Sequence, residues 1–209
     1  MLGTPSRNRI AERREGVRRE ILDAAWSQAR DVGLANITLR DIAREVGMQP
    51  PSLYSHFASK NAIYDAMYAE AWLTYEESAA ALEPLPEHPR VAIAKIARGF
   101  FDFAVADLAR HQLMNQRTIP GFEPSADAYA PAVRVLEQCR AMLAGCGVTD
   151  SADVDIWLAL IGGLIDQQLA NDPRGDRYSR LLERAIDMWA DAIGVPKHSP
   201  AATKAARKR

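Results

Sequence analysis

Residues 38–60 read TLRDIAREVGMQPPSLYSHFASK, a segment with a glycine and two prolines between two short runs of helix-forming residues. Thr38 is a favourable N-cap, and the apolar residues after it recur at the three- and four-residue spacing of one helix face. Gly47 can adopt the left-handed conformation that ends a helix. Pro50 and Pro51 suit the first turn of a new helix, because a proline there loses no hydrogen bond. The segment therefore predicts two short helices joined by a tight turn.

The second of these helices, expected over residues 51–57, has one apolar side and one polar side. Leu53 and Phe57 are four residues apart and can anchor the helix. The other side carries hydrogen-bonding groups on Ser52, Tyr54 and their neighbours. A helix, a glycine turn and a short helix with a polar face are typical of a helix-turn-helix, whose second helix enters the DNA major groove.

Residues from about 21 to 68 resemble the DNA-binding domain of the tetracycline-repressor (TetR) family of bacterial transcriptional regulators. The order and spacing of many positions carry this resemblance, which makes it more specific than a lone helix-turn-helix pattern. It covers roughly the first third of the chain, and the remainder is similar to the family only in its helical pattern and length. The matching positions are 21–25, 33, 38–43, 46–47, 52–54, 56–57 and 59–60.

The resemblance implies DNA-binding roles for nine residues. Thr38 and Arg40 would meet the DNA backbone or a base edge from the first helix of the motif. The recognition surface would comprise Gln49, Pro50, Pro51, Ser52, Tyr54 and His56. Phosphates would be bound by Tyr54, His56 and Lys60. Alternatively, Tyr54 and His56 pack inside the domain and Lys60 is merely solvated.

The charge distribution supports a nucleic-acid partner at one end of the chain. Residues 1–60 contain ten Lys or Arg and seven Asp or Glu, a net charge of +3, whereas residues 61–196 contain eleven against twenty, a net charge of −9. Residues 197–209 add five basic and no acidic residues. A basic end beside an acidic body is what a protein needs when only that end binds phosphate.

Helical periodicity continues to the end of the chain, and no strand pattern of useful length appears. We therefore predict an all-α fold of about nine helices: three in an N-terminal DNA-binding head, and the rest in a ligand-binding and dimerisation body. Beyond the motif, the helices are expected near 16–32, 60–82, 90–108, 109–117, 125–144, 150–170 and 176–193. The predicted divisions are a flexible basic arm (1–15), a helix-turn-helix domain (16–60), a helical regulatory and dimerisation domain (61–195) and a disordered basic tail (196–209).

Two apolar stripes near the C-terminus predict a homodimer interface. In the resembled family the last two helices pair with their copies in a four-helix interface. Gly162 and Gly163 fall within the first of these helices, and helical glycines are usually kept where another backbone approaches. Alternatively, both stripes belong to the core of one chain. The stripes are Trp157, Ile161, Leu164 and Gln168, followed by Leu181, Ala185, Met188 and Ala192.

A small-molecule site is expected between the body helices, lined by aromatic and methionine side chains. The ligand would be apolar or aromatic, although such residues at helical spacing are more often plain core. The candidates are Phe100, Phe103, Met114, Phe122, Tyr129, Met142 and Trp157.

Several other classes of protein find no support in the sequence. The four histidines are scattered and have no metal-ligand spacing with Cys139 or Cys146, which are expected to be free thiols. No nucleophile motif, secretory leader or apolar run of about 20 residues is present, so we predict neither an enzyme nor a membrane protein, no metal or cofactor, and a cytoplasmic location.

These patterns together predict a homodimeric, ligand-responsive transcriptional regulator, most often a repressor by resemblance. Two heads on a dimer would bind a palindromic double-stranded DNA operator, and a small-molecule effector would release it. The alternatives are a constitutive DNA-binding or adaptor protein whose packed body binds another protein, and a helical small-molecule-binding protein whose head no longer binds DNA.

Overall fold

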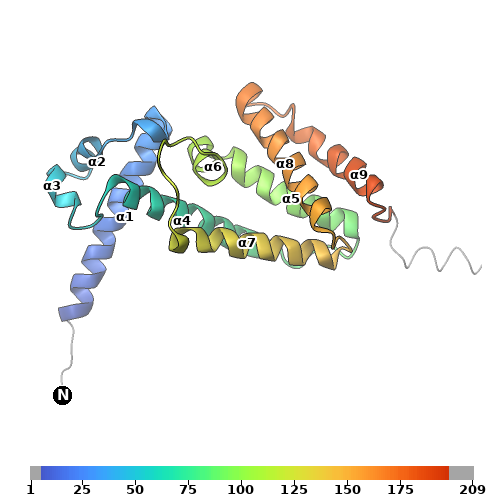
Figure 1. Cartoon of the computed structure of the whole chain (residues 1–209), viewed down its shortest axis with the longest axis horizontal. Coiled ribbons are helices and arrows are strands. Elements are labelled where there is room, and N and C mark those ends of the chain that lie inside the picture. The colour runs from blue at the N-terminus through green and yellow to red at the C-terminus, as the bar shows by residue number, and fades with distance from the viewer. Residues whose placement is uncertain (1–5, 198–209) are drawn as a thin grey trace, which may run out of the picture. The chain divides into compact units, whose positions relative to one another are not determined.

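The computed structural model describes residues 6–197, and every element found in that range is helical (Figure 1). This confirms the all-α prediction and the count of nine α-helices within the described range. The α-helices are α1 (Ser6–Val32), α2 (Leu39–Glu45), α3 (Pro50–Leu53), α4 (Lys60–Ala80), α5 (Pro89–Val105), α6 (Leu108–Asn115), α7 (Ala126–Gly145), α8 (Ser151–Asn171) and α9 (Leu182–Ala192). Two 3-10 helices, η1 (Leu34–Asn36) and η2 (Ser179–Leu181), complete the set.

The chain divides into two compact units, which are described separately. Unit 1 comprises the chain up to Ala71 together with Ala109–Ala130, and unit 2 comprises Trp72–Leu108 and the chain from Pro131 onward. The division passes through α4, between Ala71 and Trp72, although α4 is one continuous helix. The predicted boundary at residue 60 lies at the start of this helix.

Unit 1 is built on α1, which supports the two short helices of the motif. One apolar face of α1, including Ile21 and Ala25, is buried, and Ile42 of α2 and Leu53 of α3 are buried in the same unit. Gly33 has a φ of +84° and follows the end of α1, as expected for a glycine that ends a helix.

Helix α1 is longer than predicted. It begins at Ser6 rather than near residue 16, so most of the expected flexible arm is helical. Residues 11–16 are exposed on it, and they include alanine, arginine and glutamate, which are good helix formers. The apolar periodicity used for the prediction starts only where the helix meets the core, so it could not mark the solvated first turns.

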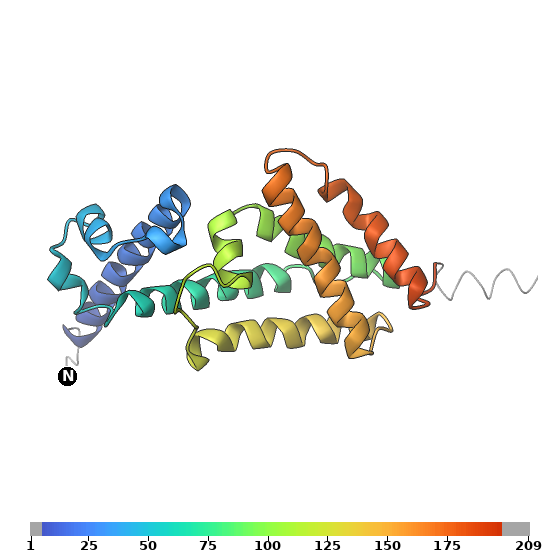
Figure 2. The ribbon, with the colours of Figure 1, turned by 45° about the horizontal axis from the view of Figure 1, so that its top comes forward.

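The core of unit 2 lies among α5, α8 and α9, with α7 packed beside them. Phe101 of α5, Trp157 of α8 and Ile186 of α9 are each no more than 2% exposed. Figures 1 and 2 show α8 and α9 as an antiparallel pair connected at one end. The Arg134 guanidinium of α7 binds the Glu76 carboxylate of α4 through two hydrogen bonds of 2.8 and 2.7 Å. Helices α4 and α7 are thus linked within this unit.

The connection between α8 and α9 is organised by a single buried amide. Gln168, which is 3% exposed, accepts hydrogen bonds from the backbone N–H groups of Tyr178 and Ser179 at 2.9 and 3.1 Å. Its Nε2 donates to the carbonyls of Asp172 and Gly175. The last helix therefore starts at Leu182 after η2, not near residue 176, because the preceding backbone turns around this amide.

The predicted tail at 196–209 lies almost entirely outside the described residues. Both cysteines are free thiols, as predicted. Burial raises the pKa of the Cys139 thiol to about 11 and also raises that of Cys146. Within residues 6–197, no helix combines the length and apolar character that a membrane span requires.

Arg90 holds the C-terminal end of α9 against the start of α5. Arg90 is 8% exposed, and its side chain donates hydrogen bonds to the carbonyls of Val195, Pro196 and Asp187. Its guanidinium also pairs with the Asp191 carboxylate at 2.6 Å. Several acceptors therefore depend on one buried cation.

We expect Arg90→Met to lower the free energy of unfolding by roughly 2–4 kcal/mol, because it leaves the buried Val195 carbonyl without its donor. Arg140→Met is the control, since Arg140 is exposed and its carboxylate partner Asp155 lies 4.0 Å away. The control should change stability by less than about 0.5 kcal/mol. Urea unfolding monitored by circular dichroism measures both, and equal stability of the two variants would contradict the role given to Arg90.

Candidate nucleic-acid interface

Helix α2 begins with the N-cap that its sequence predicts. The Thr38 hydroxyl accepts a hydrogen bond from the Asp41 backbone N–H at 3.1 Å and donates one to the Asp41 carboxylate at 2.6 Å. The hydrogen bond from Thr38 holds the pKa of Asp41 below its usual value, and Arg44, at 2.8 Å, acts in the same direction. Thr38 thus fixes the start of α2, while Arg40 stands exposed on the same helix.

The turn between the two short helices depends on Gly47. Its φ is +68°, and its N–H donates to the Arg44 carbonyl at 3.2 Å. The next N–H, of Met48, donates to the Ala43 carbonyl at 2.7 Å. This pair of bonds satisfies the free carbonyls at the end of α2, and the positive φ favours glycine at this position.

Helix α3 is shorter than the predicted span of 51–57. It covers Pro50–Leu53, and the chain continues as a turn in which Tyr54, Ser55 and His56 donate to carbonyls three residues earlier. The Ser55 hydroxyl also donates to the Ser52 carbonyl at 2.7 Å. These short-range bonds tighten the backbone and stop an α-helix from continuing.

The recognition segment (residues 49–57) presents a polar, exposed face. Leu53 and Phe57 are 1% and 4% exposed and anchor the segment, as their spacing predicts. Tyr54 is 57% exposed, which does not fit the alternative that it packs inside the domain. Among the remaining predicted contacts, Gln49, Pro51 and Ser52 are exposed, whereas Pro50 and His56 are half-buried.

Lys60 is half-buried at the first position of α4. Its Nζ lies 3.5 Å from the Ala35 carbonyl oxygen and 5.3 Å from the centre of the Tyr64 ring. Burial lowers the pKa of Lys60 and raises that of Tyr64 to about 12. The Tyr64 hydroxyl donates to the Leu34 carbonyl at 2.6 Å, so the ring under the lysine is itself fixed.

Two arginines of α1 contact the recognition segment, and the sequence did not reveal this. The sequence pattern places Arg14 in a flexible arm and indicates no role for Arg18. In the structure Arg14 donates to the Ser55 carbonyl at 3.1 Å, and Arg18 donates to the His56 carbonyl. Their four-residue spacing on a helix was the available signal, because it places both on one face.

The predicted ligand-lining residues are divided between the two units. In unit 2, the Tyr75 ring packs against Phe100 and Phe103, and Met142 and Trp157 belong to or pack against the hydrophobic core. In unit 1, Phe122 packs against Tyr64 and Tyr129 stacks on Tyr68. Met114, also in unit 1, is buried.

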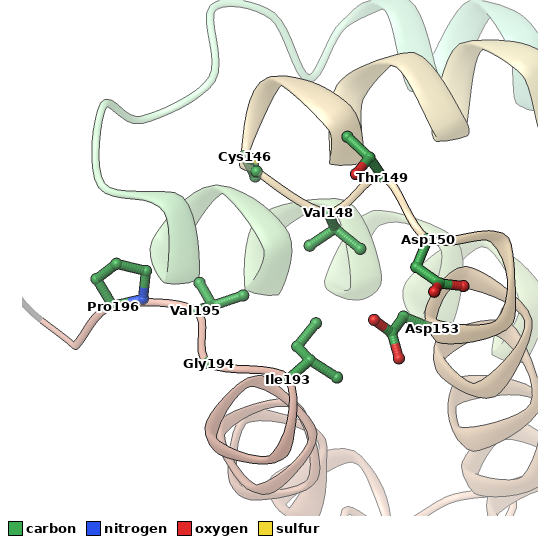
Figure 3. Close-up of a pocket in the computed structure, with 10 residues that line it drawn as sticks. Cys146, Val148, Thr149, Asp150, Asp153, Ile193, Gly194, Val195 and Pro196 are labelled. Carbon is green, nitrogen blue, oxygen red and sulfur yellow. The ribbon is translucent and has the colours of Figure 1, made fainter.

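Two cavities lie among the described residues of unit 2 and share one wall residue. The larger, of about 520 Å³, lies where the α4–α5 connection and the start of α5 meet the C-terminal half of α7, and Met142 is the predicted residue that lines it. The smaller, of about 170 Å³, lies between the α7–α8 turn and the segment after α9 (Figure 3). Cys146 contributes to both walls. Among the described residues, no group of three or more metal-ligating side chains is placed to hold an ion.

The predicted interface stripe on α8 requires a correction. Trp157, Ile161 and Gln168 are at most 3% exposed and are used inside unit 2, so they cannot form an open surface of this chain. Leu164 is half-buried. The α8 face that is open lies one residue away, which is about 100° around a helix, and includes Ile156 at 56% exposure. On α9, Leu181 and Met188 are 38% and 64% exposed, Ala192 is exposed and Ala185 is half-buried.

The fold and the exposed recognition segment define a class: an all-helical DNA-binding protein with an N-terminal helix-turn-helix. Residues 21–67 match the model of a family described as bacterial regulatory proteins, tetR family. A tetracycline repressor protein, class A, from transposon 1721 of Escherichia coli is 29% identical over 182 residues, covering 82% of this chain and 80% of the relative. Residues 21–67 are therefore a DNA-binding domain of the TetR family, and the chain resembles a tetracycline repressor over most of its length.

Solved structures share the fold over most of the chain. A TetR-family regulator, PfmR from Thermus thermophilus, has a TM-score of 0.61 at 20% identity and covers 81% of this chain and 96% of its own. FadR from Bacillus subtilis, solved with stearoyl-CoA, has a TM-score of 0.59 at 15% identity, covering 82% and 96%. RolR, solved with resorcinol, has a TM-score of 0.56 at 16% identity, covering 86% and 96%.

Proposed function

We propose that this protein is a homodimeric repressor that binds a palindromic operator and is released by a small-molecule effector. The observation that carries the proposal is the recognition segment, which is anchored by two buried apolar side chains and exposes Gln49, Ser52 and Tyr54. Glutamine can pair with a base edge, whereas serine and tyrosine hydroxyls suit phosphate oxygens. Residues 16–60 act as the DNA-binding domain, and residues 61–195 act as the regulatory and dimerisation domain.

Arg40 and Lys60 contribute to DNA binding in different ways. Arg40 is exposed and free to extend toward a phosphate or a base edge from α2. Lys60 is fixed by the Ala35 carbonyl and the Tyr64 ring, so its charge stays at the N-terminal end of α4. Positive charge and the helix N-terminus act together there to attract a phosphate. Half-buried Pro50 contributes differently, through an apolar contact with the methyl group of a thymine.

Dimerisation uses the open faces of α8 and α9. These faces carry Ile156 and Met188, apolar side chains that water surrounds in the isolated chain. A Cβ added to Gly162 or Gly163 would meet nothing within 4 Å among the described residues, so the packing of this chain does not require glycine at either position. Each glycine costs a helix about 1 kcal/mol relative to alanine. Close approach by the helices of a second copy accounts for keeping them.

The effector binds in unit 2, in the cavity of about 520 Å³ that Met142 lines. This volume lies within the range of sites for small organic molecules, roughly 300–1,000 Å³. Leu85, Pro86 and Ala92 share the lining and suit the apolar part of a ligand, whereas Glu83, Glu87 and Gln138 offer it polar groups. Proteins of the same fold bind ligands as different as stearoyl-CoA and resorcinol. Release of DNA follows if the ligand prefers a state in which α4 has shifted.

Selection of bound duplexes from a random DNA pool at near-physiological salt tests the proposal directly. We expect enrichment of one palindrome with two related half-sites, because a two-fold dimer presents two identical recognition segments. If a folded, dimeric preparation enriches no sequence, the proposed operator binding is wrong.

We expect the pair of substitutions Ile156→Glu and Met188→Glu to convert the dimer into a monomer, because each places a charge in the apolar interface. Sedimentation equilibrium measures the change, with an expected loss of dimer affinity of at least about 100-fold. Val91→Glu is the matched control, since Val91 of α5 is 52% exposed and outside the two faces. Dimers of unaltered affinity in the double variant would exclude this interface.

We expect Ala141→Trp to abolish the response to the effector by filling the cavity that Ala141 lines. Ala144→Trp, also exposed on α7 but outside the cavity lining, should leave the response intact. A thermal-shift screen of apolar compounds identifies a ligand, and its release of the selected operator is then compared among the three proteins. A ligand that acts equally on Ala141→Trp would have to bind elsewhere.

A further inference from the structure

The turn that follows α3 ends in backbone carbonyls that α1 holds. Arg14 donates to the Ser55 carbonyl at 3.1 Å, and Arg18, one turn further along α1, donates to the His56 carbonyl. The Arg18 guanidinium also lies 4.0 Å from the centre of the Phe57 ring. Two cations from one face of α1 therefore contact three consecutive residues at the end of the recognition segment.

This segment is too short to maintain its own geometry. Helix α3 has four residues, and the backbone bonds that the next residues make within the segment join positions three apart, together with the bond from the Phe57 N–H to the Leu53 carbonyl. Isolated helical segments of this length are unstable in water. Leu53 and Phe57 anchor one apolar side of the segment in the domain. The arginine contacts supply directional bonds at its far end.

The chemistry of the contacts suits a supporting role. Carbonyls in the last turn of a helical segment have no partner within it, and a cationic donor satisfies them and complements their partial negative charge. The Arg18 side chain is 33% exposed, and one face of its guanidinium covers the Phe57 ring. Glu15, on the same helix, lies 4.0 Å from Arg18 and offsets part of its charge. An arginine held in this way is less available to a phosphate.

We propose that Arg14 and Arg18 form an arginine brace that positions the recognition segment for sequence reading, rather than contacting DNA themselves. The proposal rests on the DNA-binding role given above. A brace and a phosphate contact differ in a measurable way. A phosphate contact contributes to every DNA sequence and to the salt dependence, whereas a brace affects only binding that requires the correct orientation of the segment.

The experiment compares Arg14→Met, Arg18→Met and Arg19→Met on the full chain. Arg19→Met is the matched control, because Arg19 is the exposed neighbour of Arg18 and its loss removes the same charge. Affinity is measured for the selected operator and for an unrelated duplex of equal length between 50 and 200 mM salt. We expect Arg18→Met to weaken operator binding about tenfold more than Arg19→Met, with equal binding of the unrelated duplex by both.

The opposite result would show that Arg18 contacts a phosphate and does not brace the segment. In that case Arg18→Met, compared with Arg19→Met, would weaken both duplexes alike and reduce the slope of log affinity against log salt by about 1. Arg18→Lys provides a second comparison, since it keeps the charge but loses the planar group over Phe57. If the brace is correct, Arg18→Lys loses part of the preference for the operator, while the slope of log affinity against log salt stays unchanged. Full operator affinity in Arg18→Lys would contradict the proposal.

Amide hydrogen exchange without DNA tests the brace separately from the proposed function. The N–H groups of residues 54–57 should exchange faster in Arg14→Met and Arg18→Met than in Arg19→Met, because the segment loses its support. Unchanged exchange in both variants would overturn the brace even if the protein binds an operator. Wild-type protein that binds both duplexes equally would instead overturn the proposed function, and the exchange rates would still decide the brace.

Discussion

The constraint on which the DNA-binding unit depends is the shortness of the recognition segment. Four helical residues cannot hold a defined orientation in water, so the surrounding unit must supply it. The burial of Leu53 and Phe57 provides the apolar part, and the carbonyl contacts of Arg14 and Arg18 provide the directional part. The length of α1 follows from this requirement, because Arg14 lies in turns of the helix that bury little apolar surface.

In unit 2, buried polar side chains fix the two ends of a helix. Arg90 and Gln168 each satisfy several backbone groups at the two ends of α9, where helix termini would otherwise leave donors and acceptors without partners. The apolar residues Ile156 and Met188 lie exposed on the outer sides of the same two helices. Internal polar bonding and external apolar surface are thus separated on the same two helices.

Local chemistry was predictable from the sequence, whereas the rotation of helices about their axes was not. The Thr38 cap, the Gly47 turn and the burial of Leu53 and Phe57 follow from neighbouring residues, and all are present. The α8 stripe was misplaced by one residue, because Trp157 and Ile156 are both apolar and only the packing of α5 and α9 distinguishes the buried one. Arg18 binds a carbonyl distant in the sequence, and Gln168 binds backbone groups of an irregular turn. Helical periodicity reveals neither contact.

The two prolines at the start of α3 have a consequence for how this protein meets an anion. A helix N-terminus usually offers several N–H groups to a phosphate, but Pro50 and Pro51 have none to donate. Phosphate binding near α3 must therefore come from side chains, and the backbone N–H groups at the start of α4 become the nearer alternative. The same prolines restrict the unbound chain, so less conformational entropy is lost when the segment settles against a duplex.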